Sequence, residues 1–200
     1  MTITYKVKNG IYVNMTNRCP CACTFCLRKN GEGVYGSDPL WLDREPTVEE
    51  VCRDVDKWEL SEYSEVVFCG YGEPTERLDD ILAVAKYIKS KSNIKIRINT
   101  NGLSDLIHGE PTAKRLAGLI DSVSVSLNAT NKDDYLKVVR PKFGIESYDA
   151  MLAFTKDATK YVPEVVMTVV DVVTSKEEQD KSLAICDSLG AKLRIRPYEA

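Results

Sequence analysis

The sequence lacks the features that mark membrane, secreted or nucleic-acid-binding proteins. No apolar run is long enough to cross a bilayer. Residues 1–10 are polar and strand-like, so they do not form a signal peptide. The 200 residues carry a net charge of −3, with both signs interspersed and no basic stripe. We therefore expect a cytoplasmic protein with no membrane partner, for which nucleic acid is not the default partner.

Histidine is nearly absent, whereas cysteine is abundant. His108 is the only histidine; it could transfer protons to a substrate, but we expect an exposed or capping side chain. In a reducing compartment, the seven cysteines are expected to be free, metal-bound or catalytic rather than disulfide-paired. Four of them lie between residues 19 and 26, and this clustering requires an explanation. We interpret the remaining three as packing residues: Cys52, Cys69 and Cys186.

Short β-rich runs alternate with longer helical runs, which is typical of βαβ units and a parallel sheet. The dipeptide Asn9-Gly10 predicts the turn of an N-terminal β-hairpin. Thr47 and Glu50 form a capping box that predicts a helix start, and Gly190 predicts a helix end. The predicted strands cover residues 4–8, 11–15, 65–69, 94–99, 122–127, 165–170 and 192–195, and the predicted helices cover 47–58, 78–90, 111–120, 146–160 and 176–189.

The strand count and the chain length favour a partial barrel over a closed one. Counting from the second hairpin strand, the sequence offers six strands for a parallel sheet. A closed eight-unit barrel needs about 250 residues, more than this chain has. We therefore expect a single α/β domain over residues 1–200, built as a partial (βα)6 TIM-like barrel with parallel strands. A doubly wound open sheet is the competing architecture.

In both architectures, ligands bind at the C-terminal ends of the strands. After the first parallel strand, Cys19, Cys23 and Cys26 have the spacing Cys-x3-Cys-x2-Cys. Three thiolates on one short loop can reach three corners of a 4Fe–4S cubane, leaving one iron free for another ligand, whereas fully held clusters take four cysteines. A structural zinc site that also uses Cys21 is the alternative, although zinc sites more often use separated cysteine pairs. We interpret Cys21 as a spectator.

The loop Cys19-Pro20-Cys21-Ala22-Cys23-Thr24-Phe25-Cys26 resembles the signature of the radical S-adenosylmethionine (SAM) superfamily. The resemblance implies that the three spaced cysteines hold a 4Fe–4S cluster, whose free iron is chelated by the amino and carboxylate groups of SAM. It also implies that Phe25 lies near the adenine. A second segment, Cys69-Gly70-Tyr71-Gly72-Glu73-Pro74-Thr75, resembles the family's Gly-Gly-Glu motif. This similarity implies that Gly72 and Glu73 help to hold the SAM amino group.

Further polar residues follow the later predicted strands. In the enzymes that the chain resembles, a polar residue at the position of Asn99 helps to bind the amino group. Ser126 and Asn128 are two residues apart on a predicted strand, so they should share a face, where the family places ribose or carboxylate contacts. Weaker candidates lie on the last two strands or at their ends: Thr168, Asp171, Arg194 and Arg196. No catalytic residue is identified.

The resemblance implies a radical SAM enzyme. A reduced cluster donates one electron to SAM, giving methionine and a 5′-deoxyadenosyl radical that abstracts hydrogen from an unknown substrate. A flavodoxin or ferredoxin is implied as the electron donor. Through the stretches 12–19, 67–75, 101–103 and 106–109, the chain looks most like the small TatD-associated radical SAM proteins, so a TatD-type hydrolase is a candidate partner. An activase that generates a radical on a partner protein and a non-enzymatic iron–sulfur or zinc protein are the alternatives.

Overall fold

In the described part of the chain, seven strands form one sheet, and their order in space follows their order in the chain. The computed structural model describes residues 1–29, 36–171 and 175–197. β1 is antiparallel to β2, and each later pair of neighbours is parallel. This confirms the predicted partial barrel with its hairpin, because a doubly wound sheet would reverse its strand order. The strands are β1 Thr4–Val7, β2 Gly10–Val13, β3 Glu65–Phe68, β4 Lys95–Thr100, β5 Ser122–Ser126, β6 Glu164–Val170 and β7 Lys192–Arg196.

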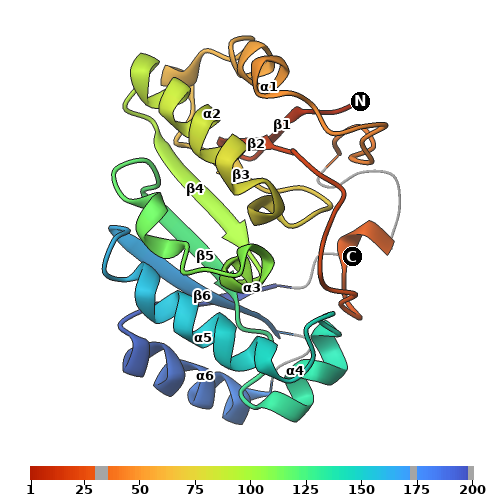
Figure 1. The fold of residues 1–200 in the computed structure, drawn as a ribbon, viewed down its shortest axis with the longest axis vertical. Coiled ribbons are helices and arrows are strands. Elements are labelled where there is room, and N and C mark those ends of the chain that lie inside the picture. The colour runs from red at the N-terminus through yellow and green to blue at the C-terminus, as the bar shows by residue number, and fades with distance from the viewer. Residues whose placement is uncertain (30–35, 172–174, 198–200) are drawn as a thin grey trace.

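The longer helices α2, α5 and α6 follow one another along the sheet in chain order, with α1 beside the first strands and α6 beside the last (Figure 1). Within the described ranges, none of them is long and apolar enough to cross a membrane. The α-helices are α1 Val48–Val55, α2 Leu78–Lys91, α3 Ser104–His108, α4 Lys132–Val139, α5 Glu146–Ala158 and α6 Lys176–Leu189. The 3-10 helices are η1 Leu27–Lys29, η2 Leu60–Glu62, η3 Pro74–Arg77 and η4 Ala113–Leu116.

The predicted hairpin is present, but its turn lies one residue earlier than expected. Val7 pairs with Gly10, so the two turn residues are Lys8 and Asn9. Lys8 takes the left-handed conformation, with φ 52°. Gly10 instead begins β2 and pairs with Glu65 of β3. The pairing of β2 with β3 therefore overrides the local preference of Asn9-Gly10 for the turn positions.

Helix boundaries were predicted well where capping residues mark them. Thr47 caps α1 through the expected capping box with Glu50, and Gly190 ends α6 with φ 76°. The helix predicted over 111–120 is wrong, because this stretch contains only η4, and Gly118 after it has φ 74°.

Two short helices, α3 and α4, were not predicted. In α4 the Asn131 side chain accepts a hydrogen bond from Asp134 N, which caps the helix start. The helix ends at Arg140, which is left-handed with φ 50°. Its apolar residues are few, and Tyr135 and Val139 are the buried ones. With so little periodic signal, packing rather than intrinsic propensity stabilises such a short helix.

Alternation along the strands gives the sheet one apolar face and one largely polar face. On β5, Val123 and Val125 belong to the main hydrophobic core, and the intervening serines point to the opposite face. Neighbouring strands repeat this pattern in register. The core face takes Val13, Phe68, Ile98, Val123 and Val165, and the opposite, concave face takes Tyr12, Val67, Arg97 and Ser122.

Candidate functional site

A cavity of about 190 Å³ lies at the C-terminal ends of the parallel strands. Residues from five successive strands or the loops after them contribute to its wall, as expected for a barrel-like fold. The lining residues are Cys69, Gly70, Gly72, Glu73, Pro74, Asn99, Thr100, Asn101, Ser124, Ser126, Thr168 and Arg196. The structure thus brings together five of the residues predicted to bind SAM: Gly72, Glu73, Asn99, Ser126 and Thr168.

Glu73 is a buried carboxylate held by protein donors. Its Oε1 accepts hydrogen bonds from Thr75 N (3.1 Å), Thr75 Oγ1 (2.7 Å) and Thr100 Oγ1 (2.7 Å). Its Oε2 accepts one, from Asn101 N at 2.7 Å. Burial raises the pKa of Glu73, and the hydrogen bonds from Asn101, Thr100 and Thr75 oppose this shift. Because Oε2 accepts a single bond, it retains capacity for a further donor such as an ammonium.

The two glycines of this loop allow close approach to the protein's own chain. A Cβ on Gly72 would lie 2.2 Å from Thr16 O and 2.6 Å from Arg18 O. A Cβ on Gly70 would lie 2.1 Å from the Oδ1 of Asn14. The adjacent Glu73 N donates to Arg18 O at 2.7 Å. The glycines therefore let the loop after β3 pack on the segment that leads into Cys19.

Asn99 has a fixed orientation on the concave face. Its Oδ1 accepts a 3.0 Å hydrogen bond from Arg97 Nη1. Arg97 is itself held by both carboxylate oxygens of Glu65, at 2.7 and 3.0 Å. Asn99 also interacts with Cys69. Burial raises the pKa of the Cys69 thiol, and a hydrogen bond between this thiol and the Asn99 side chain opposes the rise. Asn99 therefore connects the cavity wall to the partly buried ion pair of Arg97 and Glu65.

The cysteine loop is fixed against the end of α4. Ala22 N donates to Val139 O at 3.1 Å, and Thr24 N donates to Val138 O at 2.8 Å. Cys21 forms an isolated antiparallel bridge with Pro141. Within the loop, Arg28 and Lys29 donate to the carbonyl oxygens of Cys21 (3.2 Å) and Cys23 (2.6 Å). This backbone support positions the loop beside the cavity.

The thiols of the loop have the chemistry of cluster ligands. Cys19, Cys23 and Cys26 are free and partly exposed. The pKa values of Cys19 and Cys23 are lowered, chiefly by hydrogen bonds from the Cys21 thiol, whereas burial raises the pKa of Cys26. Among the described residues, no three His, Cys, Asp or Glu side chains converge as ligands of one metal ion. A 4Fe–4S cluster does not require such convergence, because each cysteine binds a different iron. The three spaced thiols therefore fit a cluster by donor type and position on one loop.

Cys21 is buried in the main core, unlike the three spaced cysteines. Asn101 Nδ2 lies 3.6 Å from the Cys21 sulfur and donates to it. The same Asn101 supplies the N–H that Glu73 Oε2 accepts. One residue at the end of β4 therefore contacts both predicted cofactor motifs.

Three residues predicted to bind SAM do not line the cavity: Phe25, Asn128 and Arg194. The expectation that Asn128 shares a strand face with Ser126 is wrong, because β5 ends at Ser126 and Asn128 has φ 63°. Arg194 is the register partner of Thr168, so the two share a face, but Arg196 is the arginine that reaches the cavity wall.

Sequence reasoning singled out neither Thr100 nor Ser124. The alternation on β5 was the available signal for Ser124, because it is two residues before Ser126 and shares its face. Thr100 had no such signal, since its hydrogen bond to Glu73 joins residues 27 positions apart. His108 lies in α3 rather than in a loop, and its Nε2 is 2.8 Å from Thr75 O. Its ring therefore supports the loop that carries Glu73.

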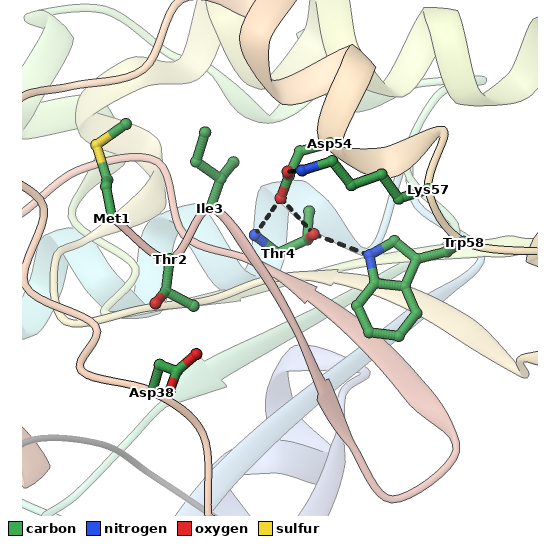
Figure 2. Close-up of a pocket in the computed structure, with 8 residues that line it drawn as sticks. All are labelled: Met1, Thr2, Ile3, Thr4, Asp38, Asp54, Lys57 and Trp58. Carbon is green, nitrogen blue, oxygen red and sulfur yellow. Dashed lines mark hydrogen bonds and ion pairs between the residues drawn. The ribbon is translucent and has the colours of Figure 1, made fainter.

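A larger hollow of about 320 Å³ lies at the β1 edge of the sheet. Figure 2 shows that four of the residues that line it, Thr4, Asp54, Lys57 and Trp58, are joined by hydrogen bonds or an ion pair. Asp54 Oδ2 accepts from Thr4 N (2.9 Å) and Thr4 Oγ1 (2.6 Å), and Trp58 Nε1 donates to Thr4 Oγ1 (2.8 Å). These groups tie β1 to α1. The smaller cavity is the better candidate site, because polar groups from many strands converge there.

The model of the radical SAM superfamily matches residues 13–184. The chain belongs to this superfamily of enzymes. Relatives include GTP 3′,8-cyclase of Lactiplantibacillus plantarum, 28% identical over 68% of this chain and 38% of its own length. GTP 3′,8-cyclase 2 of Mycobacterium tuberculosis is 28% identical over 95% of this chain and 50% of its own. The chain thus spans half or less of the length of these two curated relatives.

Solved structures share the radical SAM fold. The SAM-bound structure of SuiB from Streptococcus suis has a TM-score of 0.65 at 16% identity and covers 94% of this chain and 38% of that protein. The FeFe-hydrogenase maturase HydG from Carboxydothermus hydrogenoformans has a TM-score of 0.66 at 17% identity, and the match covers 96% of this chain and 44% of HydG. Both likenesses support the partial barrel.

Proposed function

We propose that this chain is the cofactor-binding core of a radical SAM enzyme, with residues 1–200 acting as one domain. Cys19, Cys23 and Cys26 hold a 4Fe–4S cluster, and SAM occupies the strand-end cavity. When bound, these groups supply one-electron cleavage of SAM and a 5′-deoxyadenosyl radical that removes hydrogen from a substrate. The observation that carries the proposal is the cavity wall itself, where Glu73 lies against the chain that leads into the cysteine loop.

The described residues have distinct roles in this proposal. Glu73 Oε2 accepts from the SAM ammonium, because among the described residues it makes only one hydrogen bond. Ser126 and Thr168 offer hydroxyls from adjacent strands, where they are register partners. The other proposed contacts are Gly72 and Asn99 in the cavity wall, Phe25 toward the adenine, and Asn128 and Arg194 around the rim.

The narrower assignment is to the small TatD-associated radical SAM proteins, and it rests on the sequence resemblance of residues 12–19, 67–75, 101–103 and 106–109. With this assignment we propose a TatD-type hydrolase as the partner, a flavodoxin or ferredoxin as the electron donor, and a cytoplasmic location. GTP is the first substrate to test, because curated relatives are named GTP 3′,8-cyclase. An activase acting on a partner protein is the variant to test next.

Anaerobic reconstitution with iron and sulfide, followed by dithionite and SAM, tests the proposal. The expected product is 5′-deoxyadenosine, measured by chromatography. Cys26→Ala should abolish it, whereas Cys52→Ala on α1 should retain it. An intact cluster without 5′-deoxyadenosine would favour an iron–sulfur carrier, and a colourless reconstituted protein would refute the proposal. A zinc protein would bind zinc stoichiometrically with all four loop cysteines, so that Cys21→Ala would weaken binding.

A further inference from the structure

The hydroxyl of Tyr135 is buried and has no hydrogen-bond partner in the part of the chain that the structure describes. The residue lies on α4 and is 0% exposed. Its ring packs edge-on against Tyr148 of α5, with centroids 5.5 Å apart. A buried hydroxyl without a partner costs free energy, so a phenylalanine of the same shape would serve packing better. The hydroxyl therefore requires an explanation other than packing.

Tyr135 and Cys21 belong to the same hydrophobic core cluster, against which Cys19 and Cys23 pack. One turn later on α4, Val138 and Val139 accept the hydrogen bonds from Thr24 N and Ala22 N that fix the loop. Burial raises the pKa of Tyr135, and the nearby thiols of Cys21 and Cys23 raise it further. The phenol therefore stays protonated at any physiological pH and is available as a donor.

We propose that, once a cluster is bound in this loop, the Tyr135 hydroxyl donates a hydrogen bond to a ligand sulfur, that of Cys23 or Cys19, and so raises the reduction potential of the cluster. The inference rests on the proposed function, since it requires a cluster in this loop. Reduction adds negative charge to the cluster and its sulfurs, so a hydrogen-bond donor stabilises the reduced form more than the oxidised form. Tyr135 is thus a positioning residue: it changes the reduction potential of the cluster and does not itself react.

The test is an anaerobic redox titration of the reconstituted protein, followed by electron paramagnetic resonance of the reduced cluster. Tyr135→Phe removes only the oxygen and should make the midpoint potential more negative. The expected shift is up to about 59 mV, which is a tenfold change in a one-electron equilibrium. Tyr148→Phe is the matched control, because it alters the ring partner and should leave the potential unchanged.

A second arm asks whether the hydroxyl acts directly. In a Cys21→Ala background, Tyr135→Phe should still lower the midpoint potential. If the shift in potential disappears in this background, the hydroxyl bonds to Cys21 instead, and the inference is wrong. An unchanged potential with an intact cluster would also overturn it while leaving the proposed function standing. Absence of a cluster in the unaltered protein would refute the proposed function instead. If Tyr135→Phe does not fold, Tyr135→Met supplies the same test.

Discussion

The backbone N–H of Asn101 donates to Glu73 Oε2 at 2.7 Å, which joins the ends of β3 and β4 across the cavity floor. The same carboxylate holds the hydroxyls of Thr75 and Thr100. The motif residue predicted to bind a cofactor is therefore also an internal brace. Because of this double role, we expect a substitution of Glu73 to change both the stability of the fold and the affinity for SAM.

Glu73→Gln should destabilise the protein by about 1–3 kcal/mol, because an amide N–H₂ would replace one acceptor oxygen among buried donors. Urea denaturation without cofactors measures this loss, and calorimetry with the reconstituted protein should show weaker SAM binding. Exposed Glu62 provides the control, Glu62→Gln, which should change neither quantity. Unaltered unfolding in Glu73→Gln would mean that the second carboxylate oxygen of Glu73 contributes nothing to folding.

Gly72→Ala should destabilise the fold by roughly 1–3 kcal/mol, the usual cost of forcing extra atoms into a packed site. The new Cβ would lie 2.2 Å from Thr16 O, so the backbone near Cys19 would have to move. Cluster content per chain, measured by absorbance and iron analysis, should fall as well. Gly10→Ala is the comparison, because its nearest contact would be 3.3 Å. Equal effects of both changes would show that the close approach is unimportant.

Glu164 should contribute a pH-dependent part of the stability. Hydrogen bonds and charge from Lys95, Ser122 and Lys192 oppose its desolvation and lower the pKa of Glu164 to about 2, from a usual 4.5. A lowered folded pKa means that the contribution is present above pH 4.5 and is lost as pH falls toward 2. Because the ion pairs are partly exposed, we expect at most about 1 kcal/mol.

The measurement is urea denaturation of the unaltered protein and Glu164→Gln across this pH range. Their difference in unfolding free energy should be constant above pH 5 and should shrink below it. A difference that grows as pH falls would contradict the assigned sign of the shift.

Local signals predicted elements only where few residues decide the conformation. The capping box of Thr47 and Glu50 works within four residues, so it was readable and correct. The turn at Lys8 and Asn9 was misplaced by one residue because β3 selects the register of β2. α4 was missed because its weak pattern depends on contacts with distant parts of the chain, including Tyr135 against Tyr148.

By itself, the sequence determined the order of βα units, the cysteine spacing and the resemblance to radical SAM proteins. These depend on periodicity and on short motifs, whose residues are neighbours in the chain. Tertiary structure alone decided that Thr100 and Asn101 bind Glu73, that Gly72 packs on Thr16, and that the hydroxyl of Tyr135 is buried without a partner among the described residues. Such pairings arise when strands and helices dock, and each depends on the positions of residues far apart in the chain.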